Sequence, residues 1–171
     1  MDKQAFHLLE EYNRRANADM NRFIAGLSMD EWNRTLGGFF SSVHGLCSHI
    51  YIVDYNWLRR FRVIRPYKTL ENEFFQEAYD FSELLFSSPG EYIAARQLLD
   101  NKIRDFIYEV TEEDLDQVLA YADSRGRQHN RNFGGCLLHV FNHQIHHRGM
   151  ISLCLELLGR DNDYANLVNI L

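Results

Sequence analysis

Residues 133–159 read FGGCLLHVFNHQIHHRGMISLCLELLG, and this stretch sets the fold class. It contains no proline, it is rich in apolar side chains, and it ends at a glycine, the residue type that most often follows a helix C-terminus. The stretch therefore predicts a long helix from about Phe133 to Leu158. Gly159 is its predicted stop.

Apolar residues at helical spacing predict further helices upstream of this segment. Ser41 or Ser42 is a typical cap for a helix that begins there, and Ser88 before Pro89 is a typical cap for another. A weaker helical pattern covers about residues 69–84, and a short helical turn is expected around Trp32. The segment 117–121, followed by the turn residues 123–126, predicts a small hairpin or extended loop. The other three long helices are predicted at about residues 3–27, 41–64 and 89–110.

Four long helices with short connections predict an all-α four-helix bundle, with the hairpin as an irregular excursion before the last helix. The chain has 171 residues, and at about 150 residues per domain this length predicts a single domain, residues 1–171. A hydrophobic content of 46% with 25% charged residues is that of a globular protein, which excludes disordered and fibrous classes.

The formal net charge is −6, so we expect no nucleic-acid partner. The densest basic run is interpreted as a solvated helix end (Arg59, Arg60, Arg62 and Arg65). Three cysteines without CxxC spacing indicate a reduced cytosol. No run of eighteen apolar residues is present, which predicts no membrane span, and Met1–Gln4 opens directly into an amphipathic pattern. We therefore expect a cytoplasmic protein.

Histidines on the last predicted helix form a candidate metal site. His139, His143 and His147 share one face, but His139 and His147 are about 12 Å apart along the axis, so one ion can contact only an adjacent pair. Either pair is possible. His143 and His147 lie in an apolar stripe, where spacing alone leaves metal binding and a hydrogen-bonded core equally open. The stripe comprises Cys136, Val140, Ile151, Cys154 and Leu158.

A third ligand has to come from another helix, and residues 41–64 supply two histidines. His44 and His49 are about 140° apart on the helical wheel, so both cannot face the core. His49 borders the apolar stripe of that helix and is the better donor, whereas His44 lies nearly opposite (the stripe is Leu46, Ile50, Val53 and Trp57). His7 and His129 are expected at the surface.

Other catalytic patterns are not found in the sequence. Cys136 and Cys154 are interpreted as small core residues, and no cysteine has a sequence neighbour that would lower its pKa. Phosphate-binding glycine loops, GxSxG and dinucleotide fingerprints do not occur.

With these residues in view, nearly the whole chain resembles the DinB family of metal-dependent enzymes. The most specific match is residues 139–149, HVFNHQIHHRG, close to the family pattern H-x-x-N-H-x-x-H-H-R-G-Q. The chain departs from it at Met150, where the family often has glutamine. Other matching positions are Tyr12, Asn13, Asn17, residues 37–45, Ser48, His49, Ile50, Asp54, Trp57 and Leu58.

The resemblance implies an up-down-down-up helix order, a homodimer, and ligation of one divalent ion by His49, His143 and His147. Three neutral imidazoles suit zinc or nickel, and iron or manganese are compatible. Three protein ligands leave a coordination position open, as in catalytic sites. Characterised branches of the family include thiol-dependent S-transferases and isomerases that use low-molecular-weight thiols.

We therefore expect a metal-dependent enzyme acting on a small-molecule substrate, with thiol transfer as the first hypothesis and metal-dependent hydrolysis as a variant. A non-catalytic metal-binding or stress-associated dimer is the alternative from another class. No carboxylate lies beside the histidine pair in sequence, Glu156 is expected to face away, and Asp54 or Asp19 can only come from another helix. The second apolar set on the last helix (Leu138, Phe141 and Ile145) is compatible with a dimer interface or with internal packing.

Overall fold

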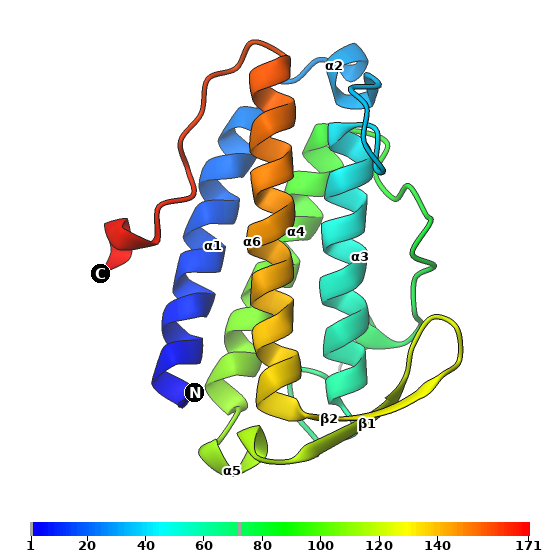
Figure 1. The fold of residues 1–171 in the computed structure, drawn as a ribbon, viewed down its shortest axis with the longest axis vertical. Helices are drawn as coiled ribbons and strands as arrows, with labels where there is room; N and C mark the ends of the chain where they lie inside the picture. Colours follow the sequence, from blue (N-terminus) through cyan, green and yellow to red (C-terminus); the bar gives the residue numbers. More distant parts are fainter. Residues whose placement is uncertain (1, 72) are drawn as a thin grey trace.

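A computed structural model describes residues 2–71 and 73–171 of the chain and is mostly helical. Four long helices lie side by side (Figure 1), and α1 and α3 each contact both α4 and α6. In Figure 1, α1 and α6 run upward, while α3 and α4 run downward. The bounds are α1 Lys3–Ala25, α3 Val43–Phe61, α4 Pro89–Glu109 and α6 Phe133–Leu157. These helices confirm the four long ones predicted from the sequence.

Within the described ranges 2–71 and 73–171, six shorter elements connect and follow the long helices. They are α2 (Met29–Asn33), η1 (Glu73–Phe75), α5 (Glu112–Leu115), β1 (Val118–Ala122), β2 (Gln128–Asn132) and η2 (Leu167–Ile170). Strands β1 and β2 pair antiparallel, with Val118 opposite Asn132 and Ala122 opposite Gln128, which confirms the predicted hairpin. Met1 and residue 72, which belong to the expected N-terminal pattern and to the expected 69–84 helix, lie outside the described residues.

Side-chain caps explain where the long helices begin. Asp2, Ser42, Ser88 and Asn132 each accept a hydrogen bond from a backbone N–H three residues later, which satisfies a donor that the helix leaves unpaired. Of the two serines considered for α3, Ser42 is the cap, and it accepts from Gly45 N at 3.1 Å.

The helix expected over residues 69–84 is wrong. Apart from the single 3₁₀ turn of η1, the described part of this segment is a loop. Side chains of α3 hold its backbone: Arg59 and Arg62 donate to the Phe75 carbonyl oxygen, each at 3.1 Å, and Asn56 exchanges two hydrogen bonds with the backbone of Tyr79. These tertiary contacts override the local helical pattern.

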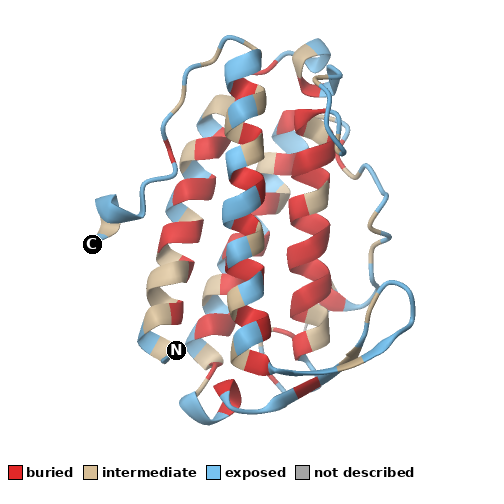
Figure 2. Ribbon diagram, viewed as in Figure 1, coloured by how far each residue is buried: buried red, intermediate tan, exposed pale blue. Residues whose placement is uncertain are grey.

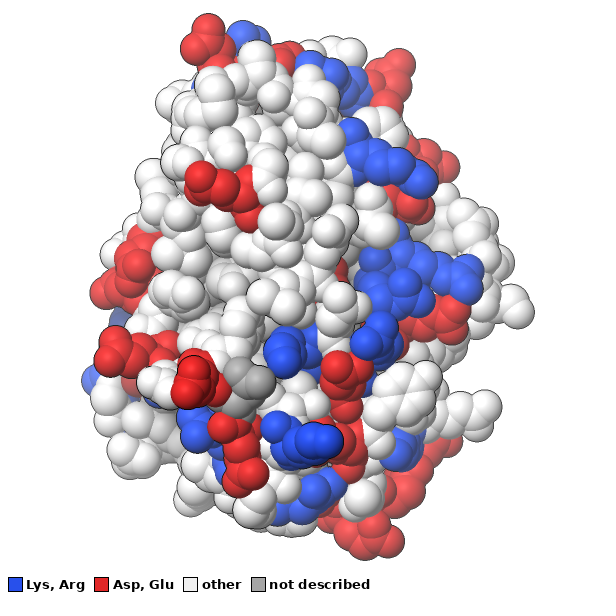
Figure 3. Space-filling view, turned by 180° about the vertical axis from the view of Figure 1, so that it is seen from behind, with Lys and Arg blue, Asp and Glu red and all other residues white. Residues whose placement is uncertain are grey.

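The same contacts refine the interpretation of the basic run at the C-terminal end of α3 as a solvated helix end, because Arg62 is exposed whereas Arg59, Arg60 and Arg65 are half-buried. Arg59 and Arg62 bind the loop, and Arg65 forms an ion pair with the buried carboxylate of Asp114 at 3.0 Å. Arg60 stacks over the ring of Trp57, with its guanidinium carbon 4.8 Å from the ring centroid. On the face shown in Figure 3, basic and acidic side chains are interspersed.

Helix α3 is buried along almost its whole length (Figure 2), and it packs against α6 and α4. The three residues of the second apolar set predicted on α6 differ in burial. Phe141 is buried with its ring 6.4 Å from that of Phe6, Leu138 is half-buried, and Ile145 is exposed. Among the described residues, no helix has the length and apolar character needed to cross a membrane.

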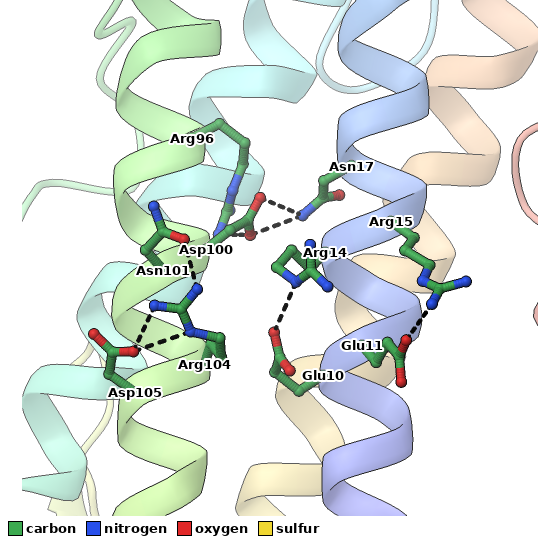
Figure 4. A network of polar contacts seen from close by, with 10 residues as sticks. All are labelled: Glu10, Glu11, Arg14, Arg15, Asn17, Arg96, Asp100, Asn101, Arg104 and Asp105. Carbon is green, nitrogen blue, oxygen red and sulfur yellow. Dashed lines mark hydrogen bonds and ion pairs between the residues drawn. The ribbon is translucent and has the colours of Figure 1, made fainter. Parts of the chain in front are cut away.

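A buried cluster of charges joins the long helices. The guanidinium of Arg96 on α4 is fully buried and lies 2.7 Å from Asp54 on α3 and 2.7 Å from Asp100 on its own helix. Asn17 of α1 donates to Asp100 at 3.0 Å (Figure 4), and Gln144 of α6 donates to Asp54. The interaction therefore involves all four long helices.

A second buried arginine completes this cluster. Arg148 of α6 donates to Asn13 and to Asn17, the latter at 3.1 Å, and its guanidinium lies over the ring of Tyr12 at 5.2 Å. Two aspartates and two arginines bring the net charge of the buried cluster close to zero. Charges in a protein interior are tolerated only when they are paired in this way.

Replacing Arg96 tests this cluster. Arg96→Met leaves Asp54 and Asp100 buried without their cation, so we expect the free energy of unfolding in urea to fall by about 3–5 kcal/mol. Arg104→Met is the matched control on α4, because Arg104 pairs with the exposed Asp105. A loss in the control as large as that in Arg96→Met would contradict the role given to the buried cluster.

Candidate metal centre

Three histidines from two helices converge in one place. His49 of α3 and His143 and His147 of α6 each offer a ring nitrogen, and these nitrogens lie within 4.8 Å of one another. The Nε2 atoms of His49 and His143 are 3.0 Å apart. His139 is exposed, and its ring centroid is 6.0 Å from that of His143. The structure thus brings together the pair 143/147 with His49, and leaves His139 outside.

The position of the histidines follows from the rotation of α6. Gln144 and Arg148 directly follow His143 and His147, and both are held by the buried charge cluster. Successive residues of a helix are turned by about 100°, so the two histidines point to a neighbouring face. That face packs against α3, where His49 lies.

The donor set fits a divalent metal ion. In tetrahedral zinc sites the metal–nitrogen bonds are about 2.0–2.1 Å, which places two nitrogen ligands about 3.3 Å apart. The Nε2 atoms of His49 and His143 are close to this separation at 3.0 Å, and all three ring nitrogens lie within 4.8 Å of one another. The Nδ1 atoms of His49, His143 and His147 are buried without a hydrogen-bond partner among the described residues. A satisfied core would have partnered them.

Burial keeps these imidazoles neutral. It lowers the pKa of His49 to about 4 and, together with the charge of neighbouring histidines, lowers the pKa of His143 to about 3 and that of His147 to about 4. A neutral imidazole is the form that binds a metal, so at pH 7 no proton has to be displaced.

Phe40 covers one side of the centre. Its ring centroid is 4.2 Å from that of His49 and 5.3 Å, edge-on, from that of His147. Gly45 permits this approach, because a Cβ at position 45 would lie 2.2 Å from the Phe40 carbonyl oxygen. The sequence placed Phe40 within the stretch 37–45 that resembles the family, and it did not predict that this phenylalanine contacts the histidines.

A cleft of about 530 Å³ opens beside His49. Phe39 and Phe40 line one part of it, and residues 80–84 line another, including the carboxylates of Asp80 and Glu83. Sequence reasoning missed these two residues because they fall in the segment expected to be helical. A cleft of this size accommodates a small molecule.

The carboxylates considered from the sequence do not reach the centre. Asp54 is bound by Arg96 and Gln144 in the buried cluster, and Asp19 pairs with Arg22 on the surface of α1. Glu156 is exposed, as expected.

The remaining histidines have other contacts. His44 stacks on Trp32 with ring centroids 5.0 Å apart, and its Nδ1 is 3.0 Å from Asn33 Oδ1, so it lies away from the centre. His7 packs against the ring of Tyr108. His129, expected at the surface, is half-buried because its Nε2 binds Asp123 at 3.0 Å.

The cysteines are free thiols. Cys47 and Cys136 are buried and Cys154 is half-buried, and burial raises the pKa of all three. Arg60 and Arg131 approach Cys136, a proximity that sequence neighbours did not reveal, but burial outweighs their charge and the pKa of Cys136 is still raised.

Comparisons with known proteins agree with this architecture. The family model described as DinB family matches residues 1–169. The crystal structure of a DinB-like protein from Bacillus subtilis superposes with a TM-score of 0.64, covering 92% of this chain and 97% of that chain at 15% sequence identity. Likeness at this identity shows the fold alone. No curated protein matches the sequence.

The depressed pKa values predict how the metal-free protein responds to acid. The ordinary histidine pKa is 6.5, whereas the folded values are about 4 for His49, 3 for His143 and 4 for His147. At a pH between these values the three histidines are protonated in the unfolded chain and neutral in the folded one. The free energy of unfolding should therefore fall as the pH drops from 6.5 towards 4. Urea unfolding in the presence of a chelator measures it.

Substituting the three histidines by glutamine gives the comparison for this titration. The variant should lose much of the dependence on pH in this window. An unchanged pH dependence in the variant would show that other groups cause it.

Proposed function

Because the chain belongs to the DinB family, we propose that His49, His143 and His147 hold one divalent metal ion and that the protein is a metal-dependent enzyme acting on a small molecule. One observation carries the proposal: three ring nitrogens within 4.8 Å of one another lie beside a cleft of about 530 Å³ that His49 itself lines. Zinc or nickel suits three imidazoles best, with iron or manganese compatible.

Three protein ligands leave at least one coordination position for a substrate or a solvent molecule. The ion would supply Lewis-acid activation, which lowers the pKa of a coordinated thiol or water. Phe40 shields His49 and His147 from bulk water, and the neighbouring cleft admits the substrate.

The hydrogen bonds in the cleft favour a thiol over water as the nucleophile. Asp80 accepts from the hydroxyl and the backbone N–H of Ser82, and Glu83 accepts from the backbone N–H of Asp80 at 2.7 Å. The hydrogen bonds from Ser82 lower the pKa of the Asp80 carboxyl, which makes it a weaker base. A thiol has an ordinary pKa of about 8.5, against about 15.7 for water, and needs less help to lose its proton.

We accordingly propose transfer of a low-molecular-weight thiol to an electrophilic small molecule. Metal-dependent hydrolysis uses the same ligands and is the variant. The non-catalytic alternative requires a centre closed to ligands, and the cleft beside His49 supports the catalytic proposal instead.

Two architectural proposals accompany this function. The contacts and directions of α1, α3, α4 and α6 support a four-helix bundle in up-down-down-up order. The exposed apolar side chains Ile145, Leu153 and Leu157 on α6 support a homodimer that buries this face.

Metal analysis tests the centre directly. The protein purified without a histidine tag should contain about one divalent ion per chain, and His49→Ala or His143→Ala should lose it, because two imidazoles bind such an ion far more weakly than three. His146→Ala is the matched control, since His146 is exposed on the same helix. Metal loss in the control equal to that in His143→Ala would contradict the assignment.

A reaction assay separates thiol transfer from hydrolysis. The metal-loaded protein should accelerate conjugation of a low-molecular-weight thiol with an electrophile, and His143→Ala should abolish the acceleration. Hydrolysis of the electrophile at an equal rate without thiol would favour the hydrolytic variant.

A further inference from the structure

A second hollow lies farther along the same two helices. It has a volume of about 420 Å³ and is lined by the rings of Trp57, Tyr121 and His139 together with Cys136 and Arg131. We call it the aromatic groove. Trp57 comes from α3, His139 and Cys136 from α6, and Tyr121 and Arg131 from the β1–β2 hairpin. Its volume is within the range of small-molecule sites.

One turn of α6 separates the aromatic groove from the three-histidine centre. His139 is one helical turn from His143, with ring centroids 6.0 Å apart, and packs edge-on against Trp57 at 5.5 Å. Trp57 is eight residues after His49 on α3, which is about 12 Å along the helix axis. The aromatic groove thus lies next to the three-histidine centre.

Arg131 gives the aromatic groove a positive charge. Its guanidinium has one protein partner among the described residues, the Asn130 carbonyl oxygen at 3.0 Å, so it keeps donors for a ligand. Arg60 lies against the rings of Trp57 and Tyr121 at 4.8 and 5.3 Å, but it lines the neighbouring hollow that also contains Asp123.

The surrounding acids do not cancel this charge. None of the residues that line the groove is an aspartate or glutamate. Asp123, whose charge acts on Arg60, is already bound by Arg127 at 2.8 Å and by His129 at 3.0 Å. The cleft beside His49 differs, because Asp80 and Glu83 line it.

We infer that the aromatic groove binds the anionic end of the substrate, and that this end is a flat aromatic carboxylate. Indole and phenol rings present faces that pack on a planar apolar group, and a guanidinium binds a carboxylate through paired N–H donors. The difference in charge between groove and cleft orients the substrate. The carboxylate of the substrate lies by Arg131, and its reactive end points to the three-histidine centre. This assignment rests on the function proposed above.

Fluorescence of Trp57 reports binding in the groove without any reaction. The chain has two tryptophans, and Trp32 is fully buried against His44 and Tyr92. In Trp32→Phe, emission therefore comes from Trp57 alone. Benzoate is the probe, and benzamide, which has the same shape without the charge, is its control. The same titration followed by NMR on the unsubstituted chain covers the case in which Trp32→Phe does not fold.

Benzoate should change the emission of Trp57 saturably in both metal-free and zinc-loaded protein, and benzamide should bind more weakly. Arg131→Gln should weaken benzoate binding by about tenfold, because it removes a charged hydrogen bond. Arg125→Gln, at the tip of the same hairpin and outside the groove, should leave the affinity unchanged. No saturable response, equal binding of benzamide, or equal affinity in Arg131→Gln would overturn the inference.

Metal content measured on the same samples keeps this test separate from that of the proposed function. Benzoate binding in a protein that takes up no metal would support the groove and overturn the metal-dependent enzyme. One metal per chain without benzoate binding would overturn the groove alone.

Discussion

The pairing of Arg96 with Asp54 and Asp100 is the interaction on which the rest of the structure depends. All three side chains are buried, and a buried charge without its partner is strongly unfavourable. The pairing therefore links α3 to α4, and the amides of Asn17 and Gln144 extend it to α1 and α6. With these partners in place, each long helix has a single rotational orientation about its own axis.

That rotation brings the three histidines of the candidate metal centre together. On α6, Gln144 and Arg148 directly follow His143 and His147 in the chain. Because the cluster holds Gln144 and Arg148 in the interior, the two histidines are turned towards His49 on α3. Loops complete the environment: Phe40 covers the histidines, and the loop held by Arg59 and Asn56 forms the wall of the cleft. Stability and function thus depend on the same segment of α6.

Structures that depend on interactions between residues close in the chain were predicted from the sequence. Caps such as Ser42 and Ser88, and apolar spacing, gave the long helices, and the wheel argument favoured His49 over His44. Helical spacing left the pairs 139/143 and 143/147 open, the family resemblance favoured 143/147, and the packing of α3 on α6 places that pair beside His49. The loop after α3 and its carboxylate Asp80 were missed, because hydrogen bonds from distant side chains shape it. The buried cluster was missed because paired charges look like surface residues in a sequence.

The most direct test of this account is X-ray absorption spectroscopy at the zinc edge of the metal-loaded protein. The account predicts three imidazole nitrogens and one further oxygen ligand at about 2.0–2.1 Å, with the imidazole scattering reduced in His49→Ala. A spectrum with sulfur ligands, or one unchanged in His49→Ala, would contradict a centre built from His49, His143 and His147.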